Sequence, residues 1–213
     1  MEVFYEIFRW IGVITGYPFK WIFFKTKIYY ENERATRRVK GGALVISNHF
    51  SPFDYVQNCF VFFPHKLYVV STEEPFQNPV IRFLFSKFWG GIEANRTTMS
   101  MRFVSQSIKE IKKGHLVQIF PEGHNTDDGT IKEFYPSYLL IAHRAGAPIV
   151  PVVTDGNYGL FKRVHLIVGE PISLSDYLPE RAKTSEVAAI NDTIRQKVLD
   201  LREELERRKA KKK

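Results

Sequence analysis

The sequence contains a single cysteine, Cys59, and lacks a long apolar run. One cysteine excludes an intramolecular disulfide and any zinc site built from several cysteines. Near the N-terminus, the longest uncharged stretch covers residues 10–19, about half of the ~20 apolar residues that a membrane-spanning helix requires. A signal peptide is not predicted, because Glu2 and Glu6 stand where such peptides carry positive charge.

Common catalytic and metal-binding patterns are also missing. The histidines other than His49 do not have the spacing of metal ligands; they are His65, His115, His124, His143 and His165. No serine lies in a Gly-x-Ser-x-Gly turn, including Ser51, so the sequence offers no nucleophile of that type. We therefore expect neither a metal nor a bound cofactor.

Positive charge and aromatic residues are abundant. The 213 residues include 31 Lys and Arg against 23 Asp and Glu, a net charge of +8, and 15% are aromatic. A hydrophobic content of 44% is typical of a globular chain of one domain. The charge indicates an anionic partner, namely nucleic acid, anionic lipid or a phosphorylated substrate.

Aromatic and apolar residues concentrate in residues 3–24. Phe4, Ile7, Phe8 and Ile11 share one helical face. Pro18 interrupts the pattern, and Lys25 and Lys27 follow it. We expect two short helices, a helical hairpin lying in a membrane interface over residues 1–29. The alternative is a pair of helices buried on the domain's own core.

Apolar runs then alternate with helical patterns. The expected strands are residues 43–47, 67–70, 91–94, 116–120, 149–153 and 164–168, and the expected helices are residues 52–63, 78–88, 98–113, 137–145 and 185–209. This alternation is typical of an α/β fold with a mostly parallel central sheet flanked by helices. We assign this domain to residues 30–183, and a C-terminal amphipathic helix with a basic tail to residues 184–213.

The first polar cluster, Asn48-His49 followed by Asp54, comes directly after the expected strand at residues 43–47. Ligand sites of open α/β sheets lie at such strand ends. One interpretation is structural: Ser51 caps the next helix and Asp54 completes a capping signature. The other is catalytic, because a strand-to-helix turn can fold Asp54 back onto His49. The two interpretations are compatible.

A histidine held by a carboxylate is a general-base unit. The carboxylate fixes the imidazole tautomer and stabilises the imidazolium that forms when the ring takes a proton. Such a base contributes ~10²–10⁴-fold in rate. Without a nucleophile of its own, the unit formed by His49 and Asp54 predicts direct activation of a substrate hydroxyl.

Three further blocks follow strands or turns. Gly91 precedes Asn95-Arg96, where a guanidinium near a helix start could bind phosphate or could simply be a surface charge. Phe120-Pro121-Glu122-Gly123 places a carboxylate at a sheet edge, although a plain turn has the same pattern. Val150-Pro151-Val152 forms an apolar strand.

Taken in order, these four blocks resemble the phospholipid/glycerol acyltransferase family, which includes bacterial 1-acylglycerol-3-phosphate acyltransferases. The family pattern is Asn-His-x-x-x-x-Asp, a glycine shortly before Asp/Asn-Arg, Phe-Pro-Glu-Gly and Val-Pro-Val. The resemblance covers about residues 40–170, and its first and third blocks together are specific. The aromatic N-terminal segment is similar to the membrane-seating helices of bacterial members.

The resemblance implies an O-acyltransferase of phospholipid synthesis. His49 would be the general base and Asp54 its orienting partner, while Asn95, Arg96, Glu122 and Gly123 would bind the acceptor. The donor would be acyl-coenzyme A or acyl-acyl carrier protein, and the acceptor a lysophospholipid, with 1-acylglycerol-3-phosphate giving phosphatidate. The protein would sit peripherally on the cytoplasmic face of an anionic membrane, with no nucleic-acid partner.

Two segments depart from the family pattern. His124-Asn125 replaces the usual Thr-Arg or Ser-Arg, and residues 134–137 lack the usual Lys and Gly. Lys132, Arg144 or Lys162 could supply the missing positive charge. The departures, including Asn125, Pro136 and Ser137, leave open a different acceptor, either another lysolipid or a hydroxylated lipid. A non-catalytic lipid- or nucleic-acid-binding module is the third alternative.

Overall fold

A computed structural model describes residues 2–72, 74–94, 101–126, 130–174 and 183–211, and these build a sheet of seven strands. The strands are β1 (Lys25–Tyr30), β2 (Ala43–Ser47), β3 (Leu67–Ser71), β4 (Gly91–Glu93), β5 (Leu116–Ile119), β6 (Ile149–Thr154) and β7 (Arg163–Val168). Their order across the sheet is β1-β7-β6-β2-β5-β3-β4, and β6 with β7 is its antiparallel pair. The predicted α/β fold with a mostly parallel sheet is confirmed.

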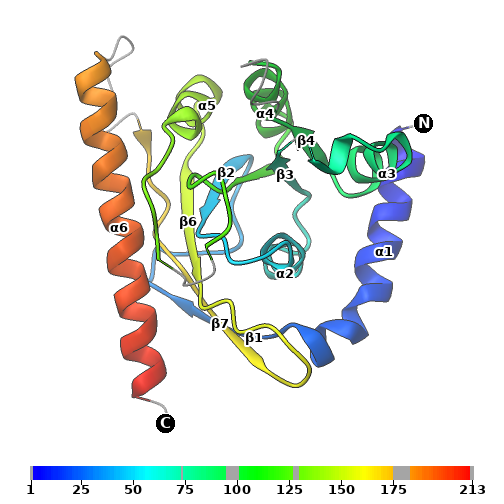
Figure 1. Ribbon diagram of the computed structural model, residues 1–213, viewed down its shortest axis with the longest axis horizontal. Coiled ribbons are helices and arrows are strands. Elements are labelled where there is room, and N and C mark those ends of the chain that lie inside the picture. Colours follow the sequence, from blue (N-terminus) through cyan, green and yellow to red (C-terminus); the bar gives the residue numbers. More distant parts are fainter. Residues whose placement is uncertain (1, 73, 95–100, 127–129, 175–182, 212–213) are drawn as a thin grey trace.

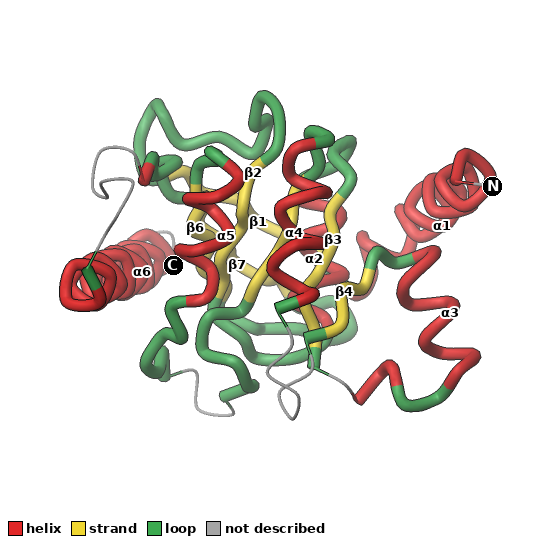
Figure 2. Tube along the Cα trace, turned by 90° about the horizontal axis from the view of Figure 1, so that it is seen from above, coloured by secondary structure: helices red, strands yellow, loops and turns green. Residues whose placement is uncertain are grey.

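Helices cover both faces of this sheet. One face carries α4 (Arg102–Lys112), α5 (Ser137–Ala145) and α6 (Thr184–Ala210), and the other carries α2 (Phe53–Val61). Beyond α2 lies α1 (Glu2–Phe23), with α3 (Pro79–Phe88) against its N-terminal part (Figure 1). Viewed from above, α6 and α1 lie on opposite sides of the molecule (Figure 2). The apolar core therefore forms two clusters, one on each face of the sheet.

The local sequence explains where the elements begin and end. Asn78 caps α3 by accepting hydrogen bonds from the amides of Val80 and Ile81. Gly146 ends α5 in the left-handed conformation, at a φ of 64°. The apolar face of the predicted amphipathic helix, now α6, is half-buried at Val187 and buried at five further residues: Ile190, Ile194, Val198, Leu201 and Leu205. A short 3-10 helix, Glu74–Phe76, was not predicted.

The predicted N-terminal hairpin is wrong, because α1 is one helix with Pro18 inside it. A proline within a helix removes one backbone hydrogen bond and bends the axis. Figure 1 shows α1 bending near its C-terminal end. Aromatic packing on both sides of Pro18 offsets this loss: Tyr17 and Phe24 both contact the ring of Phe60.

Residues 25–30 also differ from the prediction, which placed the basic pair Lys25 and Lys27 in a helical segment reaching residue 29. They form β1, which pairs in parallel with β7 at the edge of the sheet. The KTKIYY sequence has β-branched and aromatic residues that suit a half-buried edge strand. The helical part of the N-terminus therefore ends at Phe23.

One side of α1 packs on the domain and the other side is exposed. Trp10 and Tyr17 contact Phe63 with ring centroids 5.4 and 6.1 Å apart. Among the side chains of α1 that the structure describes, the exposed large apolar ones are Phe4, Ile7, Phe8, Ile11, Ile14, Trp21, Ile22 and Phe23. The alternative of a helix buried on the domain's own core does not hold for this exposed side, and the interfacial expectation stays a prediction. In the described part of the chain, no helix has the length and hydropathy needed to cross a bilayer.

The close packing of β2 against α4 yields a test of the fold. A Cβ atom added to Gly42 would overlap the main-chain carbonyl oxygen of Ile111 in α4. We expect Gly42→Ala to lower the free energy of unfolding by about 1–3 kcal/mol, because the helix must shift. Urea unfolding checks this.

The matched control is Gly12→Ala in α1, where an added Cβ meets nothing within 4 Å. Alanine has the higher helix propensity, so this variant should be as stable as the wild type or slightly more stable. Equal unfolding midpoints for Gly42→Ala and the wild type would contradict the packing of α4 against the start of β2.

Candidate active site

Three loops meet at the carboxyl edge of the central strands. Residues 48–52 follow β2, residues 120–126 follow β5, and residues 155–162 join β6 to β7. Because β2, β5 and β6 are parallel neighbours, their ends converge at one edge of the sheet. The side chains of the first and third predicted blocks lie here.

His49 and Asp54 are in direct contact. Nδ1 of His49 lies 2.9 Å from Oδ2 of Asp54, whose side chain is fully buried, while 17% of the His49 side chain is exposed. In the neutral imidazole this arrangement places the proton on Nδ1, which donates to the carboxylate. Nε2 is then an unprotonated acceptor that no described residue engages. The pair has the geometry of a general base with its orienting carboxylate.

The turn between β2 and α2 also fixes Asp54 from the main chain. Its Oδ2 accepts hydrogen bonds from the amides of Phe50 at 2.7 Å and Ser51 at 2.8 Å. Reciprocally, Oγ of Ser51 accepts a hydrogen bond from the amide of Phe53 at 3.1 Å. The N-cap residue of α2 is Pro52, which has no side-chain cap hydrogen bond, so the predicted cap formed by Ser51 and Asp54 is not found at the helix start. Asp54 instead closes the turn before α2 and contacts His49 with the same carboxylate.

A residue that the sequence analysis missed completes the surroundings of Asp54. The hydroxyl of Tyr158, in the loop between β6 and β7, lies 2.5 Å from Oδ1 of Asp54 and 2.6 Å from Oε1 of Gln57. Burial, together with the negative charge of Asp54, raises the pKa of the Tyr158 hydroxyl, which therefore stays protonated and donates. No motif marks this tyrosine, because 104 positions separate it from Asp54.

The ring of His49 is fixed by stacking as well. Its face lies on Phe120 with ring centroids 3.8 Å apart and an interplanar angle of 14°. Phe120 directly follows β5 and is half-buried. This contact restricts rotation of the imidazole and covers one of its faces, so a reacting group must approach from the ring edge that carries Nε2.

Asn48 ties the catalytic turn to the neighbouring strand. Its buried amide donates to the carbonyl of Thr154 at 3.0 Å and accepts from the Thr154 amide at 2.9 Å. Arg202 of α6 donates to the same carbonyl at 3.1 Å. The Asn of the Asn-His motif therefore serves as a brace between the ends of β2 and β6.

Glu122 is fully buried and holds two loops through their main chains. Oε1 accepts a hydrogen bond from the His49 amide at 3.3 Å, and Oε2 accepts one from the Lys132 amide at 3.0 Å. Burial raises the pKa of the Glu122 carboxyl, and those two amides offset part of the rise. Gly123, with a φ of 74°, completes a turn that a side chain would strain. In this geometry Glu122 faces inward.

The remaining expected site residues do not all lie at this edge of the sheet. Asn95 and Arg96 lie outside the described residues. Lys132 is exposed and lines a pocket of about 540 Å³ together with Glu122, His124 and Arg195. Lys162 lies in the loop at the same sheet edge, whereas Arg144 in the last turn of α5 lies toward the opposite edge, where β6 begins. Lys132 is thus the described candidate nearest to the third block.

Within the described ranges, no three His, Cys, Asp or Glu residues come together as a metal site requires. The arrangement offers proton transfer by His49 and main-chain hydrogen bonding from the surrounding turns.

Comparison with known proteins identifies a family and related sequences. Residues 27–155 match the family model described as Acyltransferase. The chain is 27% identical over 173 residues to the 1-acyl-sn-glycerol-3-phosphate acyltransferase of Bacillus subtilis strain 168, a match covering 78% of this chain and 83% of that protein.

A solved structure shares the fold. The crystal structure of the 1-acyl-sn-glycerophosphate (LPA) acyltransferase of Thermotoga maritima superposes with a TM-score of 0.62 at 21% sequence identity, covering 93% of this chain and 79% of that chain. Because the family match covers more than half of the sequence and includes both the His49-Asp54 turn and Glu122, the chain belongs to the acyltransferase family and is an O-acyltransferase.

Proposed function

We propose that this enzyme transfers a fatty acyl group from an acyl-thioester to the free hydroxyl of 1-acylglycerol-3-phosphate, producing phosphatidate. The observation that carries the proposal is the hydrogen bond between Nδ1 of His49 and the buried Asp54, which leaves Nε2 available as a base. The names of the relatives support the choice of acceptor. The donor is acyl-coenzyme A or acyl-acyl carrier protein.

The reaction follows from the properties of the dyad. Nε2 of His49 removes the proton of the acceptor hydroxyl as its oxygen attacks the thioester carbonyl, and Asp54 stabilises the imidazolium that forms. The tetrahedral intermediate collapses with cleavage of the C–S bond. The imidazolium returns its proton to the departing thiolate, so that a free thiol and an ester leave. No covalent acyl-enzyme is required.

The buried position of Glu122 supports a positioning role beside the predicted role in acceptor binding. Its two carboxylate oxygens are already engaged by the main chains that carry His49 and Lys132. Glu122 would thereby hold the turn that carries His49 next to the segment before α5 that carries Lys132, called here the Lys132 loop. The general base His49 and the positive charge of Lys132 could then both face one acceptor. Arg96 remains our proposal for a phosphate-binding residue, together with Asn95 and Gly123.

A different acceptor is the second candidate. Asn125 replaces a basic residue of the family pattern, and Pro136-Ser137 replaces a segment that contains Lys and Gly. Another lysolipid or a hydroxylated lipid would then receive the acyl group through the same dyad. Mass spectrometry of the products from a panel of acceptors separates the two candidates. A purely lipid-binding module would need no buried carboxylate behind a histidine.

We further propose that the protein binds peripherally to the cytoplasmic face of an anionic membrane. The exposed apolar side chains of α1, together with Val80, Ile81, Phe83 and Leu84 of α3, support a lipid-facing surface. Lys20 lies in the last turn of α1, and Lys25 begins β1 directly after it. Apolar groups flanked by lysine favour adsorption to anionic lipid.

The role of His49 can be tested by substitution. We expect His49→Ala to lower the rate of free-thiol release from acyl-thioester and 1-acylglycerol-3-phosphate by ~10²–10⁴-fold, because the base is lost. His143→Ala in the last turn of α5 is the matched control and should keep wild-type turnover. Equal rates for His49→Ala and the wild type would refute the mechanism.

The positioning role of Glu122 yields a separate prediction. Glutamine has one oxygen and one NH₂ group. In Glu122→Gln the NH₂ group must therefore face the main-chain N–H of either His49 or Lys132, and because both groups are donors, one of the two hydrogen bonds is lost. We expect the free energy of unfolding to fall by about 1–3 kcal/mol and turnover to fall with it. Urea unfolding and thiol release measure both quantities.

Glu133, an exposed residue next to Lys132 in the chain, offers the control for this change. Glu133→Gln should alter neither stability nor turnover. If Glu122→Gln unfolds at the wild-type urea concentration but has a higher KM for the acceptor, then Glu122 contacts substrate and does not brace the loops.

Membrane binding by α1 can be tested by adding charge to its exposed face. Ile7 and Ile11 are about half exposed, at 53% and 48%. We expect Ile7→Glu/Ile11→Glu to lower binding to anionic vesicles by about tenfold or more, because apolar burial is lost and like charges repel. Vesicle co-sedimentation is the measurement.

A charge-matched control is Ala188→Glu/Ala189→Glu on exposed positions of α6, the helix on the opposite side of the molecule. This variant should bind vesicles almost as well as the wild type. Equal loss in both variants would show that net charge, rather than the α1 surface, governs binding.

A further inference from the structure

The loop between β6 and β7, residues 155–162, has an apolar tip that the catalytic mechanism does not use. Leu160 and Phe161 are 59% and 76% exposed, and Phe161 is the most exposed of the large apolar side chains described. Phe161 also has a φ of 58°, in the left-handed region that aromatic residues rarely adopt. The backbone is therefore strained in a conformation that presents a phenyl ring to the outside.

This loop is ordered by its own hydrogen bonds. Asp155 accepts from the amides of Asn157 at 3.2 Å and His165 at 3.0 Å. The side chain of Asn157 donates to the carbonyl of Arg163 at 3.2 Å. A tip held in this way presents its apolar residues at little cost in conformational entropy on binding.

The tip lies next to the end of α1. The amide of Phe161 donates a hydrogen bond of 3.0 Å to the carbonyl of Ile22 in the last turn of that helix. Trp21 and Phe23, in the same turn, are 67% and 42% exposed. The apolar surface of α1 therefore continues onto the loop.

Positive charge borders one side of this shared surface. Lys162 and Arg163 follow the tip directly, and Lys25 lies beside Arg163 in the pairing of β1 with β7. All three are exposed, and none forms an ion pair with a described residue. Exposed aromatic and aliphatic groups at a loop tip, followed by basic residues, match an anionic lipid surface better than the groove that a protein partner would fill.

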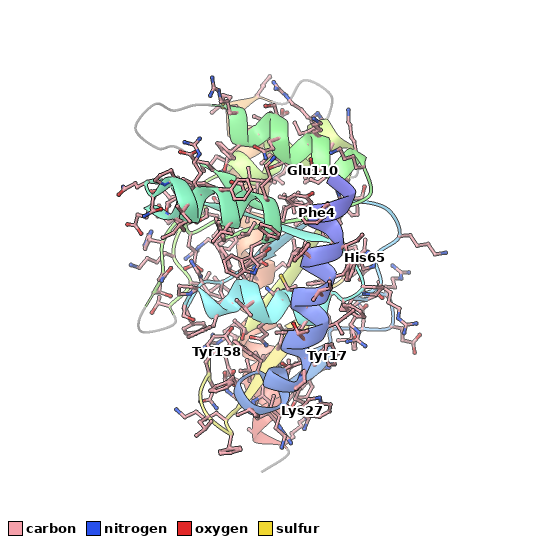
Figure 3. All side chains as sticks on the ribbon, turned by 90° about the vertical axis from the view of Figure 1, so that its right-hand side faces the viewer. Phe4, Tyr17, Lys27, His65, Glu110 and Tyr158 are labelled. Carbon is pink, nitrogen blue, oxygen red and sulfur yellow. The ribbon has the colours of Figure 1, made fainter. Side chains whose placement is uncertain are left out.

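The same loop reaches the catalytic centre. Tyr158, two residues before Leu160, bonds to Oδ1 of Asp54, and its ring lies 6.1 Å from Phe24 and 6.0 Å from Phe53. In Figure 3, Tyr158 lies near the C-terminal half of α1, well away from Phe4 at the other end of the helix. One short loop thus contacts the end of α1 and the carboxylate of the dyad.

We propose that the loop between β6 and β7 is a second membrane-contacting element of this enzyme, in which Leu160 and Phe161 enter the anionic lipid surface beside the end of α1 and Tyr158 positions Asp54. The proposal rests on the peripheral membrane binding proposed above. It places the dyad directly behind the lipid contact, where an acceptor held in the bilayer would present its hydroxyl.

Depth measurements test the lipid contact directly. Cys59→Ala removes the single cysteine, and Leu160→Cys then carries a nitroxide label. On vesicles of phosphatidylglycerol and phosphatidylcholine, we expect the label to gain collisions with oxygen and to lose collisions with a water-soluble nickel complex. A label at Glu203→Cys, on the exposed side of α6, should not change. A Leu160 label that stays accessible to the nickel complex would overturn the proposal.

The second test compares activity in two assay formats, on vesicles and with a monomeric acceptor in solution. Leu160→Ser/Phe161→Asn removes the apolar tip, and asparagine tolerates a positive φ, so the loop conformation is kept. We expect vesicle binding and turnover on vesicles to fall about tenfold. Turnover with a short-chain monomeric acceptor without vesicles should stay within about twofold of the wild type, since the dyad is unchanged.

Tyr158→Phe separates positioning from lipid contact. It should lower kcat in both formats with little change in KM, and vesicle binding should be unaffected. The variant removes the hydrogen bond to Oδ1 of Asp54 and leaves the acceptor site unchanged, so the effect should fall on kcat and not on KM. A wild-type kcat, or a loss that lies in KM, would contradict the positioning claim.

The remaining outcomes are distinguishable. If the tip variant loses turnover only with an acyl-acyl carrier protein donor and binds vesicles normally, the surface docks the acidic carrier protein and the membrane proposal is wrong. If the wild type turns over no acceptor in either format while the Leu160 label still enters the lipid, the proposed reaction fails but the membrane contact stands.

Discussion

The carboxylate of Asp54 is the point on which the catalytic arrangement depends. A buried carboxylate is unfavourable unless hydrogen-bond donors surround it. Here the donors are the amides of Phe50 and Ser51, Nδ1 of His49 and the hydroxyl of Tyr158. Each donor comes with a structural consequence: the amides close the turn into α2, the imidazole is held with Nε2 outward, and the tyrosine fastens the loop between β6 and β7.

The rest of the site braces these parts through the main chain. Asn48 joins the catalytic turn to β6, and Glu122 joins it to the Lys132 loop. Both side chains are buried, so their hydrogen bonds are shielded from competing water. Phe120 then fixes the plane of the imidazole. The motif residues around His49 therefore largely position one side chain, as the proposed mechanism requires, in which the nucleophile is the substrate's own hydroxyl.

Sequence alone predicted the local part of this arrangement. His49 and Asp54 are five positions apart in a strand-to-helix turn. The apolar runs predicted β2 to β7 because their pattern is local, but β1 was missed because its half-buried edge sequence lacks such a run. Tyr158 was missed because only the tertiary fold brings it to Asp54. The inward orientation of Glu122 depends on a loop amide, which a turn motif does not reveal. At the N-terminus, Pro18 predicted a break between two helices. The helix α1 is continuous instead, because Tyr17 beside the proline packs on Phe60 and Phe63.

The most direct test of this account is the tautomer of His49. Two-bond proton–nitrogen correlation spectra of the enzyme labelled with ¹⁵N-histidine report which ring nitrogen carries the proton, and comparison with His49→Gln assigns the signal. If Asp54 holds the ring as described, neutral His49 carries its proton on Nδ1 and leaves Nε2 unprotonated. A proton on Nε2 would contradict the proposed base, because the nitrogen facing the acceptor could not then accept a proton.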